Sequence, residues 1–154
     1  MTAASTNSFW DIFSNPVFMT AFWAWLAAQV IKVIIERVTT KKVDFKRLVG
    51  SGGMPSSHAS FTVGLTVAAG LYAGWGSWTF AISAAFALVT MYDASGVRQA
   101  AGKQAAVLNE IVEMLQTNHV FPADKLKELI GHTRFEVVVG AVLGAIIALI
   151  VYYI

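Results

Sequence analysis

The chain has 154 residues, of which 56% are hydrophobic and only 13% are charged. Soluble domains usually carry about 25% charged residues, so this composition argues against an ordinary soluble protein and favours a membrane protein. There is no cysteine, which excludes disulfides and thiolate metal sites. The net charge of +2 gives no reason to expect a nucleic-acid partner. By length the whole chain, 1–154, is predicted to be a single domain.

Four apolar segments predict an all-α, integral membrane helical bundle. Each approaches the roughly 20 residues that a helix needs to cross a hydrocarbon core. The predicted spans are residues 17–35, 59–75, 78–92 and 135–154. Before the first span, the aromatic stretch 9–13 predicts an interfacial segment, and Pro16 is suited to a first helical turn.

The segment 93–116 has a different pattern. Its apolar residues recur at helical spacing, with Lys103 and Glu110 on other faces, which predicts an amphipathic helix that either lies on the membrane surface or packs on the bundle. Residues 122–130 predict a short helix ended by Gly131.

The first span carries polar residues on one face. Gln29 and Lys32 are three residues apart, so they share a face that should contact protein or water instead of lipid. The alternative is that Lys32 only extends along the helix end towards the headgroups.

The basic residues lie on one side of the predicted bundle. All eleven Lys and Arg fall between residues 32 and 47 or between 98 and 134. The positive-inside rule then predicts that both long loops are cytoplasmic and that both termini are outside. We therefore expect an integral protein of a bacterial inner or plasma membrane.

Two polar segments stand directly before apolar helices. The first, residues 52–60, reads Gly-Gly-Met-Pro-Ser-Ser-His-Ala-Ser, and the second, residues 131–136, reads Gly-His-Thr-Arg-Phe-Glu. A Gly-Ser turn at a helix N-terminus binds anions through backbone N–H groups, and nearby Lys and Arg add positive charge. A histidine can act as nucleophile or general acid, and a carboxylate can orient it. Together these residues predict a phosphoryl-transfer site on the cytoplasmic face, with no metal or other cofactor.

The same residues resemble a known family. Pro55-Ser56-Ser57-His58 is similar to the Pro-Ser-Gly-His motif of the type 2 phosphatidic acid phosphatases, which are relatives of the vanadium haloperoxidases. The stretch from His132 to Gly140 resembles that family's His-x-x-x-Asp-x-x-x-Gly element. Together with Tyr-Asp-Ala-Ser-Gly-Val-Arg at 92–98, the pattern looks like the divergent branch of the family.

The resemblance implies a role for each matching residue. His132 would attack phosphorus, Glu136 would orient it, and His58 would protonate the leaving alkoxide. The implied phosphate-binding residues are Lys32, Arg47, Ser56, Ser57 and Arg98. Asp93 is a further candidate, which either belongs to the site or caps the amphipathic helix.

The sequence departs from the family pattern in three places. Ser57 replaces a glycine, the Arg-Pro of the first motif is absent, and Arg98 is separated from His132 by the amphipathic segment. These departures keep two alternatives open: a phospholipid binder without turnover, and a scaffold with vestigial motifs.

The leading interpretation is a phosphatase for a lipid phosphate or diphosphate. The expected partners are the membrane and a phospholipid or polyprenyl phosphate substrate, which the sequence does not distinguish. A homodimer is a further expectation, because the small residues around Gly64 and Gly140 could form a helix-packing face.

Overall fold

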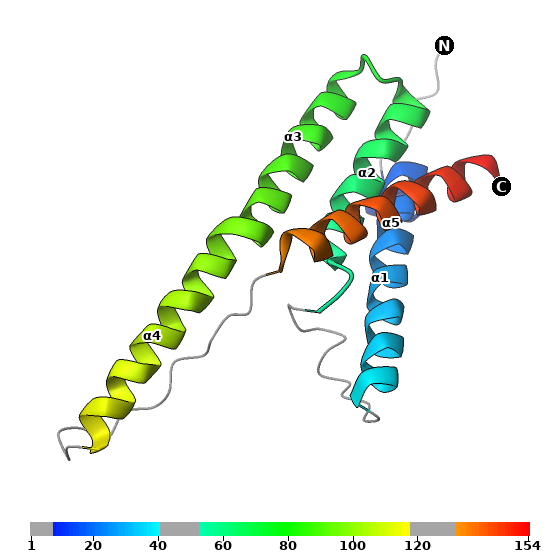
Figure 1. The fold of residues 1–154 in the computed structure, drawn as a ribbon. Coiled ribbons are helices and arrows are strands. Elements are labelled where there is room, and N and C mark those ends of the chain that lie inside the picture. Colours follow the sequence, from blue (N-terminus) through cyan, green and yellow to red (C-terminus); the bar gives the residue numbers. More distant parts are fainter. Residues whose placement is uncertain (1–7, 41–52, 118–131) are drawn as a thin grey trace, which may run out of the picture.

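Helices make up all the regular structure that is described in the chain, which confirms the predicted all-α class. A computed structural model describes residues 8–40, 53–117 and 132–154 (Figure 1). In chain order the elements are the 3₁₀ helix η1 (Phe9–Ser14), α1 (Pro16–Thr40), α2 (Ser57–Ala73), α3 (Trp78–Tyr92), the π-helix η3 (Asp93–Val97), α4 (Arg98–Thr117) and α5 (Arg134–Tyr153).

The helices begin where side chains can cap them. Asn15 Oδ1 accepts hydrogen bonds from the N–H groups of Val17 and Phe18, and Ser77 Oγ accepts one from Phe80 N. These bonds satisfy N–H groups that have no partner inside the helix. The observed bounds of α3 equal the predicted span, whereas α1 continues past the predicted end at residue 35.

Helix α2 lies at the centre of the bundle and contacts α1, α3 and α5. In Figure 1, α1 and α3 run downwards, α2 runs upwards, and α5 crosses α2 obliquely from left to right. Three of the described helical segments are long and apolar enough to cross a membrane: α1, the continuous helix from α3 into α4, and α5. Helix α2 has 17 residues, at the lower limit for a span, so the fourth span stays a prediction.

Small residues let α2 approach its neighbours closely. A Cβ on Gly144 would collide with Ser60 O and would lie 2.9 Å from Gly64 N. Ser60 also contacts α1, because its Oγ donates a hydrogen bond of 2.8 Å to Ala24 O. The Gly64 and Gly140 faces are therefore packed within the chain, so they are not available as a homodimer surface, and the homodimer itself stays a prediction.

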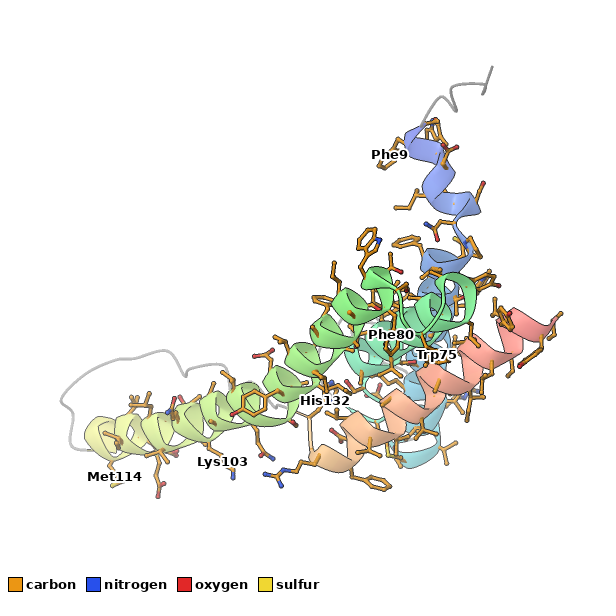
Figure 2. The ribbon with its side chains drawn as sticks, turned by 90° about the horizontal axis from the view of Figure 1, so that it is seen from above. Phe9, Trp75, Phe80, Lys103, Met114 and His132 are labelled. Atoms are coloured by element: carbon orange, nitrogen blue, oxygen red, sulfur yellow. The ribbon has the colours of Figure 1, made fainter. Side chains whose placement is uncertain are left out.

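Helix α4 continues the line of α3 and extends away from the other helices (Figures 1 and 2). Its main contact is with η3, and Val107 and Met114 are more than half exposed. In the described residues, α4 does not pack on the bundle, which was one of the two alternatives for this amphipathic helix. The other alternative, a position on the membrane surface, stays a prediction. The predicted helix at 122–130 lies outside the described residues.

We predict that Gly144→Ala destabilises the protein although alanine is the better helix former. The helix preference would contribute about 0.5–1 kcal/mol of stability, but forcing a methyl group against the backbone of α2 costs about 1–3 kcal/mol. Thermal unfolding in detergent should therefore show a lower midpoint. Gly76→Ala is the control, because a Cβ there meets nothing within 4 Å. An unchanged or raised midpoint for Gly144→Ala would contradict the close α2–α5 contact.

Candidate functional site

The Gly-Ser segment before α2 forms a tight turn. Gly53 has a φ of 80°, a left-handed conformation that favours glycine. Ser56 is the N-cap of α2, and its Oγ accepts a hydrogen bond from Ala59 N. Ser56 is fully buried and Ser57 is 4% exposed, so the turn brings two serines into the interior of the bundle.

His132 and Glu136 form a pair at the start of α5. His132 Nδ1 lies 3.2 Å from Glu136 Oε2, and the imidazole is buried. The same carboxylate oxygen accepts a hydrogen bond from Thr133 N, while Glu136 N donates to Thr133 Oγ1. This reciprocal pattern is a capping box, and it fixes the position of the carboxylate that faces the histidine.

Backbone contacts join this pair to two other elements. Ser56 N donates to Glu136 O at 3.1 Å, and His132 N donates to Ala94 O of η3, also at 3.1 Å. Figure 2 shows His132 beside the junction of α3 and α4. A Cβ on Gly140 would collide with Ser56 O, so the absence of a side chain there is what permits α5 to lie against the turn.

Lys32 completes the polar cluster from α1. Its side chain is 6% exposed, and its Nζ donates a hydrogen bond of 3.2 Å to Ser57 Oγ. Lys32 therefore contacts protein, and the alternative that it only extends along the helix end towards the headgroups is wrong.

His58 has a different environment from His132. It is exposed and lines an apolar hollow of about 420 Å³ together with Trp25 and Phe61. The structure thus places His58 at the same helix end as the cluster, but on a face of α2 that opens outward.

The remaining predicted site residues are only partly described. Asp93 is the first residue of η3 and is half-buried, next to the Ala94 carbonyl that accepts from His132 N. Arg98 begins α4, and its side chain is not among those described. Arg47 lies outside the described residues. In the described ranges, no group of three or more His, Cys, Asp and Glu could hold a metal ion.

Two contributions to the site were missed by the sequence reasoning. Thr133 was not recognised as the cap that holds Glu136, although Thr-x-x-Glu before an apolar run is a capping-box signal. Gly140 was interpreted as a general packing residue, whereas it is the point where α5 meets Ser56. Nothing in the local sequence indicates which backbone a glycine will face.

The sequence of the chain is similar to known proteins. The profile of a family described as "Divergent PAP2 family" matches residues 13–147. The chain is 37% identical to a Bacillus subtilis protein described as "Uncharacterized membrane protein YuiD", over 93% of this chain and 98% of that protein. No solved structure matches the chain.

Proposed function

Because this chain belongs to the divergent PAP2 family, we propose that it is a membrane phosphatase that hydrolyses a lipid phosphate or diphosphate through a phosphohistidine. The observation that carries the proposal is the buried His132–Glu136 pair, held against the capped N-terminus of α2 beside Lys32. Burying a lysine and a histidine costs free energy, because both groups lose their hydration. At an anion site, a bound phosphate would offset this cost.

The phosphate would bind at the first turn of α2. Helix N-terminal N–H groups and the positive end of the helix dipole favour an anion, and the Lys32–Ser57 pair supplies an ammonium group and a hydroxyl. Arg98 and Arg47 are proposed to add guanidinium contacts to phosphate oxygens. The bound phosphate would then lie between α1, α2 and the start of α5.

The proposed reaction has two steps. Glu136 Oε2 accepts a hydrogen bond from the Nδ1–H group of His132, so Nε2 carries the lone pair that attacks phosphorus. The bond between phosphorus and the lipid oxygen breaks, and His58 donates a proton to the leaving alkoxide. Water then attacks the phosphohistidine and gives a proton to His58, which releases phosphate and regenerates both histidines. The cations stabilise the charge on the equatorial oxygens.

A second candidate function is lipid-phosphate binding without turnover. It is favoured by the exposure of His58 and by the three departures from the family pattern. Phosphate release from a panel of lipids separates the two functions, because a binder would retain the lipid unchanged. A scaffold with vestigial motifs would do neither.

We predict that the two histidines respond differently to substitution. His132→Ala should abolish turnover of every substrate and trap no phosphohistidine. His58→Ala should lose about 10²–10⁴-fold on a lipid phosphate, the usual contribution of a general acid. It should lose much less on p-nitrophenyl phosphate, whose leaving group needs no proton, and should still trap a phosphohistidine.

Lys103→Ala, on the extended α4, is the control for loss of a basic side chain and should retain activity. Equal losses for both histidine variants on both substrates would mean that the roles are wrongly assigned. If neither variant changes turnover, the catalytic proposal fails.

The site is proposed to face the cytoplasm. The support is the distribution of Lys and Arg, which are absent from the α2–α3 turn and from the C-terminal span after Arg134. We predict that a cysteine introduced at Gly76, in that turn, reacts with an impermeant thiol reagent added to intact cells. A cysteine introduced at Lys42 should react only after lysis. The reverse labelling pattern would move the site to the outer face.

A further inference from the structure

Two apolar hollows lie end to end along α2 and α3 and share Phe86. The inner hollow, of about 420 Å³, is lined by Ser57, His58, Phe61, Phe86 and Thr90, with Phe22 and Trp25 of α1 beside them. The outer hollow, of about 300 Å³, is lined by Leu65, Ala69, Thr79, Ile82 and Phe86. Together they form what we call the α2–α3 groove. Their volumes are in the range of ligand sites, about 300–1,000 Å³.

The length of the α2–α3 groove matches one leaflet of a bilayer. It follows α3 from Thr90 at the inner end to Thr79 at the outer end. At a rise of 1.5 Å per residue this is about 16 Å. Half of a hydrocarbon core of about 30 Å is about 15 Å. A hydrocarbon chain lying in the groove would therefore reach from the polar end to about the middle of the membrane.

Three hydroxyl groups along the groove donate hydrogen bonds to backbone carbonyls of their own helices. Thr62 Oγ1 donates to His58 O at 2.9 Å, Thr90 Oγ1 donates to Phe86 O at 2.8 Å, and Ser83 Oγ donates to Phe80 O at 2.9 Å. Such bonds satisfy the hydroxyl protons within the helix. The wall of the groove thus presents mainly aromatic rings and alkyl groups, which suit a hydrocarbon chain.

A charged group stands at the inner end of the groove. Ser57 lines it, and Ser57 Oγ is the acceptor of the Lys32 ammonium hydrogen bond. A hollow of similar size, about 410 Å³, lies between α1 and α5 and is lined by Trp23 and by aliphatic side chains such as Ala27 and Ile147. Among the described residues, the hollow between α1 and α5 has no charged or hydroxyl side chain in its lining that could hold a headgroup.

We propose that the α2–α3 groove binds the hydrocarbon chain of a phosphorylated lipid, with the phosphate at the Ser57 end and the chain directed towards Thr79. This inference rests on the proposed function, because it uses the same anion site. It adds the direction from which the lipid enters, laterally between α1 and α3, and a length limit on the bound chain. Phe86, where the two hollows meet, would contact the middle of the chain.

Photolabelling tests the groove without requiring turnover. The full chain is placed in phosphatidylcholine vesicles with phosphatidic acid that carries a diazirine near one end or the other of one acyl chain. A diazirine close to the glycerol should label Trp25 or Phe61, and one near the terminal methyl should label Leu65 or Ile82. Unlabelled phosphatidic acid should compete, and extra phosphatidylcholine should not.

A matched pair of variants strengthens the test. Ile82 is 62% exposed, so Ile82→Trp should fold while filling the outer hollow. The indole would exclude the end of the acyl chain from the outer hollow. Losing the burial of about two methylene groups should lower labelling by the terminal diazirine about tenfold. Ala27→Trp fills the hollow between α1 and α5 and should leave the labelling of the groove unchanged.

Each result has a distinct meaning. Each diazirine could label the inner and outer hollows equally, or unlabelled phosphatidic acid could fail to reduce the labelling. Either result would mean that ordinary bilayer lipid fills the groove, and the inference would be overturned. Competed labelling in the expected order without any phosphate release would support the groove and contradict the phosphatase. Phosphate release with labelling elsewhere would support the phosphatase and contradict the groove.

Discussion

The close approach of α5 to the N-terminus of α2 is the constraint on which the site depends. Gly140 permits the contact with Ser56, and Gly144 permits the contact with Ser60 one turn further along. With the helices this near, the Glu136 carbonyl can accept from Ser56 N. That bond fixes the capping-box end of α5, and with it His132, relative to the serine turn. A larger residue at Gly140 would separate His132, the proposed nucleophile, from the proposed phosphate site.

The arrangement also places the buried His132 and the apolar groove at different faces of α2. On one side of α2, the turn is sealed by α5 and η3, where His132 is buried. On another side, His58 and Phe61 line the outward-opening groove. Ser57 takes part in both, since it contacts Lys32 and lines the groove. A lipid phosphate at Ser57 would thus have a buried histidine and lysine near its phosphorus and an apolar path for its chain.

Much of this could be predicted from the sequence, because its strongest signals are local. The all-α class and the span at 78–92 follow from apolar runs between turn residues, and the polar face of α1 correctly indicated that Lys32 contacts protein. The Gly64 and Gly140 faces were assigned to a second copy of the chain, whereas they pack within it. Helical spacing shows that the residues on one face are small, but it does not show which backbone they will meet. The projecting position of α4 could not be predicted either. Its amphipathic pattern is equally compatible with a membrane surface, a bundle or an extension of α3.

The central claim is that Lys32 and the α2 turn form an anion site, and orthovanadate binding measures it most directly. Vanadate resembles pentavalent phosphorus, and isothermal titration of the purified protein gives its Kd without any substrate. Lys32→Met keeps the length of the side chain and removes its charge, so it should raise the Kd about tenfold or more, since hydrogen bonds to charged groups contribute about 1.5–3 kcal/mol. Lys103→Met, on α4, should leave the Kd unchanged. If Lys32→Met binds vanadate as tightly as the unaltered protein, the buried lysine does not serve an anion site and the account is wrong.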